Sequence, residues 1–368
     1  MRYRELGKTG LKLSELGFGA MRLPMKAADG AEAVDRDLAI PMIHRAFEGG
    51  VNYIDSAVFY CNGDSQRAVG EALKSWRGGR IHVGTKNNYY GPDEAAWWKN
   101  LEDSLKFLQV DCIDLYHTHG VNWKGWLEHI EPHISHWMRK ARDQGLIRHI
   151  VTSFHDDNEA LRKIIDTGFF ESVLLQYNLL DRKLEDGIAH AGEKGVGVIV
   201  MGPVAGGRLG AQNPVFASML PQLQRVPELA LRFVLANPGV TVALSGMSSL
   251  EQVKENVVIA SDPATLSETD RAAIDEHLER LKKMKDLYCS GCGYCKPCPQ
   301  NVDIPAIFDL YNNGRVYGFW DASKGWYKGH CDKKTDASQC TECGACTEKC
   351  PQKIDIPNEL KKAAAALT

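Results

Sequence analysis

The stretch "IHVGTK" (residues 81–86) is rich in β-branched residues. It is followed by the helix-type stretch "PDEAAWWKNLEDSLKFL" (92–108) and then by a second β-type stretch, "IDLYHTH" (113–119). A strand, a helix and another strand in this order form a β-α-β unit, in which the two strands run parallel. This part of the sequence therefore predicts a parallel sheet covered by helices.

Stretches of the same β type recur at a steady interval along the first 265 residues. Six more are "LGFGA" (16–20), "NYIDSA" (52–57), "HIVTSF" (149–154), "VLLQYN" (173–178), "GVIVMG" (197–202) and "VTVALSG" (240–246). Helix-type stretches separate them, and several end on glycine, a common helix-stop residue. Eight such units match an α/β fold of the (β/α)8 TIM-barrel type better than an open sheet. No G-x-G-x-x-G follows an early strand, which argues against a Rossmann domain.

Nine of the eleven cysteines lie in the last eighty residues. The run "CTECGACTEKCP" (340–351) has the C-x2-C-x2-C-x3-C-P spacing of a bacterial [4Fe–4S] site, and "CSGCGYCKPCP" (289–299) is one residue shorter in its last gap. CxxC pairs also bind zinc. Two runs of four thiols, each closed by Cys-Pro, favour two [4Fe–4S] clusters over zinc, and Cys331 is expected to be a bystander between them.

The two runs resemble those of two-cluster ferredoxins, in which the fourth cysteine of each run ligates the other cluster. One cluster would then be held by Cys289, Cys292, Cys295 and Cys350, and the second by Cys340, Cys343, Cys346 and Cys298. Each run leads into a similar phrase, "CPQNVDIP" (298–305) or "CPQKIDIP" (350–357), which predicts a short helix with proline in its first turn. We expect a barrel domain at 1–266, a linking helix at 267–288 and a small α-helical, ferredoxin-like iron–sulfur domain at 289–368.

The active site of such a barrel forms at the C-terminal ends of its strands. These ends carry Asp55, Tyr60, Lys86 and His119. A phenol titrates near pH 10, and a neighbouring cation such as Lys86 lowers that pKa. Tyr60 is therefore a candidate proton donor to a carbonyl oxygen, with Lys86 held charged and in place by Asp55. His117 competes with His119 for the histidine role, but His119 lies nearer the mouth on the same side of its strand.

The segments "YRELGKTGLKLSELGFGAMRLP", "NYIDSAVFY", "VGTK", "DLYHTHG" and "ALSGMSSLEQVKENV" resemble the aldo-keto reductase family over about residues 1–265. The tail resembles a subgroup of this family that ends in a ferredoxin-like domain. The resemblance implies a catalytic tetrad of Asp55, Tyr60, Lys86 and His119, and a nicotinamide coenzyme in place of a flavin.

The same resemblance implies a set of coenzyme-binding residues. Ser153 and Gln176, assisted by Asn178, would bind the carboxamide, and Met201 would pack on the nicotinamide ring. The remaining positions follow the pyrophosphate and then the adenosine: Gly202, Pro203, Val204 and Gly206, then Ser245, Gly246, Met247, Ser248, Gln252, Glu255 and Asn256. NADPH-preferring relatives place basic residues at the adenosine end. This chain has Gly246 and Gln252 there, so NADPH and NADH both stay open.

The bulk composition is that of an ordinary globular protein, with a net charge of −3, 44% hydrophobic residues and 25% charged residues. The first residues contain no apolar signal-peptide core, and no run approaches the roughly 18 apolar residues of a membrane span. We therefore expect a cytoplasmic protein that binds neither nucleic acid nor membrane.

The combined prediction is an NAD(P)H-dependent oxidoreductase that interconverts a carbonyl and an alcohol by direct hydride transfer. Tyr60 would be its general acid and base, its substrate would be a small carbonyl or alcohol, and two [4Fe–4S] clusters would occupy the tail. A redox partner protein is a further option. The alternative is an iron–sulfur electron-transfer or redox-sensing protein in which the barrel is a docking or interaction module.

Overall fold

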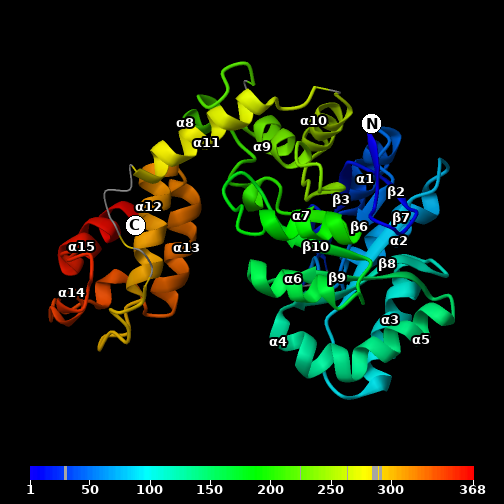
Figure 1. Cartoon of the computed structure of the whole chain (residues 1–368), viewed down its shortest axis with the longest axis horizontal. Helices are drawn as coiled ribbons and strands as arrows, with labels where there is room; N and C mark the ends of the chain where they lie inside the picture. The colour runs from blue at the N-terminus through cyan, green and yellow to red at the C-terminus, as the bar shows by residue number, and fades with distance from the viewer. Residues whose placement is uncertain (29–30, 224, 263, 284–288, 290–291) are drawn as a thin grey trace. The chain divides into compact units, whose positions relative to one another are not determined.

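The computed structural model describes residues 1–368 except 29–30, 224, 263, 284–288 and 290–291. The described chain divides into two compact units, drawn in Figure 1. One unit comprises residues 1–210 and 227–266, and the other comprises residues 211–226 and 267–368. Residues 211–226 were expected in the barrel domain, but by their contacts they belong to the second unit. Among the described helices, none is long and apolar enough to cross a membrane.

Within the described residues, eight parallel strands close the first unit into a barrel and follow one another around it in chain order. They are β3 (Leu16–Gly19), β6 (Tyr53–Asp55), β7 (His82–Asn87), β8 (Ile113–Val121), β9 (Ile147–Phe154), β10 (Ser172–Gln176), β11 (Gly197–Met201) and β12 (Val242–Ser245). The ring closes where Ala243 of β12 pairs with Leu16 of β3. Each strand falls on one of the eight expected stretches, so the predicted (β/α)8 barrel is confirmed.

Helices surround the strands (Figure 1), and side chains of the preceding loops begin several of them. Asp35, Asp93, Asp157 and Ser249 accept hydrogen bonds from backbone N–H groups in the first turn of the helix that follows. The helices are α1 (Arg36–Glu48), α2 (Ser65–Ser75), α3 (Glu94–Leu108), α4 (Trp123–Gly125), the π-helix η2 (Trp126–Ile134), α5 (Ser135–Asp143), α6 (Asn158–Asp166), α7 (Glu185–Lys194), α9 (Val226–Leu235) and α10 (Leu250–Ser261), with short 3-10 turns η1 (Ala20–Arg22) and η3 (Ala205–Gly207).

Two short hairpins precede α1 and were not predicted. The first joins β1 (Tyr3–Glu5) to β2 (Lys12–Ser14), and the second joins β4 (Met25–Ala28) to β5 (Ala31–Val34). Leu6 and Leu13, from the first hairpin, are fully buried and pack in the same apolar cluster as the inward-facing strand residues Leu115, Val151 and Ile199. The barrel interior is therefore a filled core, completed by the N-terminal hairpin.

The second unit is helical. Its helices are α8 (Pro214–Ala217), α11 (Glu268–Lys283), α12 (Ile304–Tyr317), α13 (Trp320–Asp332), η4 (Ala337–Gln339), α14 (Ala345–Glu348) and α15 (Ile356–Leu367). The expected linking helix is α11, which Ser267 caps by exchanging hydrogen bonds with Asp270, and the last positions of that prediction, 284–288, lie outside the described residues. As expected, α12 and α15 each carry proline in the first turn.

The segment 211–226 is packed into this second unit. Phe216 is fully buried and stacks on Phe319, with ring centroids 5.5 Å apart. Asn213 donates a hydrogen bond through Nδ2 to the carbonyl oxygen of Tyr317 at 2.8 Å. An aromatic ring and a backbone carbonyl therefore fix a loop that follows a barrel strand to the end of α12.

The variant Phe216→Ala should loosen the second unit. Truncating a buried phenylalanine typically costs about 3–5 kcal/mol of folding free energy. Hydrogen exchange followed by mass spectrometry should show faster exchange in peptides from α12. Trp326→Ala is the matched control, because Trp326 lies on α13 of the same unit and is 59% exposed. Equal protection in both variants would mean that segment 211–226 contributes little to the unit.

Candidate active site and cysteine-lined cavities

A buried ion pair lies at the C-terminal end of β6. Lys86 Nζ, from β7, forms an ion pair with Asp55 Oδ1, and both side chains are only 1% exposed. Lys86 also donates to the carbonyl oxygen of Ser56 at 2.8 Å. The second carboxylate oxygen of Asp55 accepts a hydrogen bond from the Tyr53 hydroxyl at 3.0 Å. The lysine ammonium is thereby fixed in one position at the barrel mouth.

Tyr60 follows β6 in a turn and lies against this pair. Lys86 Nζ is 4.9 Å from the centroid of the Tyr60 ring. Burial raises the pKa of Tyr60, and this effect exceeds the opposite effect of the Lys86 charge and hydrogen bond. The net lowering expected from the sequence is therefore absent in this structure. The hydroxyl is protonated at neutral pH, as a proton donor must be.

His119 completes the group from β8. Its ring meets the Tyr60 ring edge-on at 6.0 Å and stacks under Phe59 at 4.8 Å. Burial, with help from the Lys86 charge, lowers the pKa of His119 to about 4, so the imidazole is neutral at physiological pH. His117 lies fully buried inside the barrel. As expected, His119 is the histidine that reaches the mouth.

The turn that carries Tyr60 has an unusual backbone. Cys61, Asn62 and Gly63 have φ angles of 53°, 57° and 84°, in the left-handed region. Glycine adopts this conformation freely and asparagine tolerates it, but it strains a cysteine. Asn62 donates through Nδ2 to the carbonyl oxygen of Glu32 at 3.2 Å, which ties the turn to the second hairpin.

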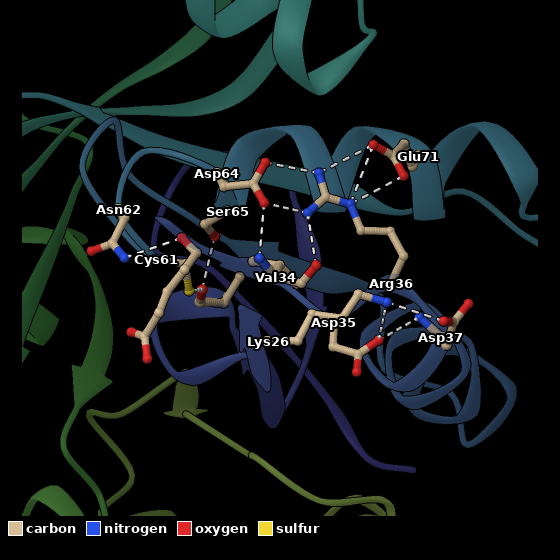
Figure 2. A network of polar contacts seen from close by, with 12 residues as sticks. Lys26, Val34, Asp35, Arg36, Asp37, Cys61, Asn62, Asp64, Ser65 and Glu71 are labelled. Atoms are coloured by element: carbon tan, nitrogen blue, oxygen red, sulfur yellow. Dashed lines mark hydrogen bonds and ion pairs between the residues drawn. The ribbon is translucent and has the colours of Figure 1, made fainter. Parts of the chain in front are cut away.

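A polar network anchors the end of the same turn. Figure 2 shows Asp64 between the Arg36 guanidinium and the backbone of Val34. Val34 donates its N–H to Asp64 at 2.9 Å, and Arg36 also reaches Glu71 at 3.2 Å. The Arg36 guanidinium holds the pKa of Asp64 below its usual value. The hairpin, α1 and α2 are thereby joined directly beside the turn of Tyr60.

The residues predicted for the nicotinamide half of a coenzyme lie at neighbouring strand ends. Ser153 is on β9, and Gln176 and Met201 are the last residues of β10 and β11. Asn178 is buried and donates through Nδ2 to the carbonyl oxygen of Gly202 at 3.0 Å. The predicted pyrophosphate segment, Gly202 to Gly206, follows β11 and includes Pro203 and Val204. Gly202 and Gly206 have φ angles of 64° and 68°, a backbone conformation that favours glycine.

The residues predicted for the adenosine half line the turn between β12 and α10. Gln252 accepts a hydrogen bond from the backbone N–H of Ser248 at 2.9 Å. Asn256 donates to Ser245 Oγ at 3.1 Å. These side chains therefore shape the turn itself. The other three predicted positions are Gly246, between the strand and the turn, Met247, which is buried, and Glu255, which is partly buried.

Arg22 is a basic residue that the sequence analysis overlooked. Its Nη2 lies 3.4 Å from the carbonyl oxygen of Gly206. Its side-chain carbons pass beside Gly246, where an added Cβ would contact them at 3.5 Å. The Arg22 side chain thus passes from Gly246 to Gly206, with its guanidinium at Gly206. The sequence feature that could have indicated this contact is an arginine just after the first barrel strand, β3, but Arg22 is far from both glycines in the sequence.

Among the described residues, the tail cysteines surround two cavities. One is lined by Cys289, Cys292, Cys295 and Cys350. The other is lined by Cys298, Cys340, Cys343 and Cys346, and Cys295 also touches it. These are the two sets that crossed ligation by the fourth cysteines implies. Cys331 is exposed and lines neither cavity.

The donor chemistry of both cavities fits iron–sulfur clusters. The walls between the thiols are apolar and include Ile304, Phe308, Val302 and Leu360. Soft thiolate donors in such surroundings suit clusters. In the part of the chain that the structure describes, no three His, Cys, Asp or Glu side chains are grouped tightly enough for a single metal ion. The thiols instead are distributed around the two cavities.

Comparison with known proteins matches residues 15–218 to the aldo/keto reductase family and residues 288–354 to the 4Fe–4S dicluster domain. L-galactose dehydrogenase from Arabidopsis thaliana is 31% identical over 312 residues, which cover 77% of this chain and 95% of the relative. NADH-specific methylglyoxal reductase from Escherichia coli strain K12 is 27% identical and covers 76% and 98%. The structure of aldo-keto reductase AKR11C1 from Bacillus halodurans, in its holo form, has a TM-score of 0.66 and 30% identity, covering 75% and 96%.

Paired cysteine variants should reveal which thiols share a cluster. The anaerobically purified protein should hold about eight irons and eight sulfides per chain, and Cys350→Ser about half of them. Adding Cys292→Ser should cost no further iron, because both residues line one cavity. Adding Cys343→Ser instead should remove most of the remaining iron. The reverse pattern would refute the crossed assignment, and zinc without sulfide in fresh protein would refute clusters altogether.

Proposed function

Because this chain belongs to the aldo/keto reductase family, we propose that its barrel interconverts a small carbonyl compound and the corresponding alcohol by direct hydride transfer, with Tyr60 as general acid and base. The chain is an NAD(P)H-dependent oxidoreductase with a C-terminal 4Fe–4S dicluster domain. The observation that carries the proposal is the convergence of Asp55, Tyr60, Lys86 and His119 at the barrel mouth.

Each residue of the tetrad has a distinct task. Bound NAD(P)H would supply a hydride to the carbonyl carbon. Tyr60 gives its proton to the carbonyl oxygen, so that one C–H and one O–H bond form and the C=O double bond becomes a single bond. Lys86 stabilises the phenolate left on Tyr60 until a proton returns from solvent, and Asp55 holds Lys86 in place. Neutral His119 can donate an N–H to the carbonyl oxygen and orient it.

The coenzyme would lie along the strand ends described above. Ser153 and Gln176 would bind its carboxamide, and Met201 would pack on its ring through a polarizable sulfur. Arg22 supports this path, because its guanidinium lies beside Gly206 and suits a pyrophosphate. One relative is named as NADH-specific. Parallel titrations with NADH and NADPH decide the preference.

The clusters are assigned a place outside this reaction. A bound [4Fe–4S] cluster would exchange one electron at a time, whereas a hydride carries two. The Tyr60 mechanism needs no electron carrier. A flavin could link two-electron hydride transfer to one-electron transfer by a cluster, but the sequence contains no flavin-binding fingerprint. Six of the eight cysteines pack against the apolar core of the second unit, and the exposed Cys292 and Cys343 line the cavities. Metal–ligand bonds supply much of the folding energy of small domains, so a structural role is our first choice.

Tyr60→Phe should remove the proton donor and keep the fold. Loss of a general acid typically lowers the rate about 100-fold to 10,000-fold. The assay is NADH or NADPH oxidation with methylglyoxal, short aldehydes, aldoses and cyclic ketones. Coenzyme affinity should hardly change, because the hydroxyl acts on the substrate. Tyr3→Phe is the matched control, since the Tyr3 hydroxyl binds the carbonyl oxygen of Gly50, away from the tetrad. Wild-type reduction by Tyr60→Phe would exclude Tyr60 as the acid.

Cluster-free protein with an intact barrel should still transfer hydride. Chelation under anaerobic conditions, with circular dichroism as a check on the barrel, supplies the material for a single-turnover experiment. A normal rate supports the structural role of the clusters. Loss of hydride transfer with coenzyme still bound would place them in the chemistry. Bleaching of the intact protein by NADH alone, without carbonyl turnover, would favour the alternative of an electron-transfer protein.

A further inference from the structure

The Asp55 carboxylate faces two polar groups that the mechanism above does not use. The Tyr53 hydroxyl donates to Asp55 Oδ2 at 3.0 Å, and His117 Nε2 lies 3.5 Å from the same oxygen. Neither Tyr53 nor His117 is exposed at all. Asp55 Oδ2, the oxygen that does not pair with Lys86, is therefore covered from inside the barrel by the neutral side chains of Tyr53 and His117.

Gly84 makes this arrangement possible. It lies on β7 directly beside Asp55. A Cβ at this position would lie 2.5 Å from the Tyr53 hydroxyl oxygen and 2.9 Å from Asp55 Oδ2, which is closer than atoms can approach. Gly84 therefore leaves room on the neighbouring strand for the Tyr53 hydroxyl and the Asp55 carboxylate to meet. The contact between Tyr53 and Asp55 is built into the packing of three residues on two strands.

Besides Asp55, the polar neighbour of the His117 ring is the backbone of Thr152. His117 lies on β8, paired with Lys86 of β7. Neither ring nitrogen makes a hydrogen bond of ordinary geometry with a described residue. Burial lowers the pKa of His117 to about 3, so the ring is neutral in the working range. Burying an imidazole with such weak hydrogen bonding is costly. The tautomer with its proton on Nε2 presents that proton to Asp55.

We propose that Tyr53 and His117 are positioning residues that share the negative charge of Asp55 and thereby set how strongly Lys86 acts on Tyr60. This inference rests on the proposed function. Hydrogen bonds from neutral donors stabilise a carboxylate and weaken its field. When these hydrogen bonds partly neutralise the Asp55 carboxylate, it offsets less of the positive charge of Lys86, and more of that charge stabilises the Tyr60 phenolate. The same carboxylate also repels the phenolate less.

The direction of the effect follows from the charges that face Tyr60. These are Lys86 from β7 and Asp55 from β6, whereas His119 from β8 is neutral. The Lys86 charge lowers the pKa of Tyr60 and the Asp55 charge raises it. Removing a donor from Asp55 should therefore raise the pKa of Tyr60. Carbonyl reduction needs the protonated phenol, so its rate is lost as pH rises through that pKa, and the loss should move to higher pH.

The test is the pH profile of kcat/KM for reduction of methylglyoxal by NADH in the full-length, cluster-loaded protein. Tyr53→Phe and His117→Leu should each move the alkaline limb upward by about 0.5 pH unit and lower kcat about 3-fold to 10-fold, with coenzyme Kd unchanged. His117→Gln should move the limb back toward the wild-type position, because its amide restores a donor to Asp55.

Two failures can be told apart. If Tyr60→Phe reduces carbonyls normally, the proposed function fails, and this inference fails with it. If Tyr60→Phe is inactive while Tyr53→Phe and His117→Leu keep the alkaline limb of the pH profile at its wild-type position, only the inference is overturned. A loss of thermal stability without a shift of the limb also overturns it, because Tyr53 and His117 would then be packing residues alone. A His117→Gln limb that stays with that of His117→Leu counts against a donor role for His117.

Discussion

The ion pair between Asp55 and Lys86 is the constraint on which the active site depends. Two charges that are 1% exposed inside a barrel are costly unless each has further partners. Lys86 has the carbonyl oxygen of Ser56, and Asp55 has the Tyr53 hydroxyl. The pair therefore holds a charged group in a fixed place at the mouth, and the Tyr60 ring lies beside the ammonium group.

The position of Tyr60 depends in turn on elements that lie outside the barrel. Its turn contains two non-glycine residues with left-handed backbone, and such a turn needs firm ends. The Arg36–Asp64 ion pair and the Asn62 amide provide them by linking the turn to the hairpin that precedes α1. The unpredicted second hairpin, which precedes the first barrel helix, thus helps to support Tyr60, the proposed proton donor.

Most of the barrel could be predicted because its strands are short apolar stretches between helix-type segments, several of them rich in β-branched residues, as in "GVIVMG" at 197–202. The proximity of Asp55, Tyr60, Lys86 and His119 could be predicted because these residues lie near the ends of successive strands. The short hairpins could not, since their strands lack the buried apolar run of the equally short barrel strands; Tyr3–Glu5, for example, is YRE with both ends exposed. Nor could Arg22, whose role beside Gly206 and Gly246 depends on approach in space. The placement of 211–226 with the tail likewise depends on contacts between residues about a hundred positions apart.

The membership of residues 211–226 in the second unit has a consequence for how the protein is made. The chain passes from one unit to the other at residues 210, 226 and 266, so the iron–sulfur unit is not a tail that one cut could remove. During synthesis Phe216 leaves the ribosome about a hundred residues before Phe319, on which it stacks. The loop that contains Phe216 can therefore reach its final packing only after residue 319 has been synthesised. A nascent chain that ends at residue 266 would therefore expose an aromatic surface whose partner does not yet exist.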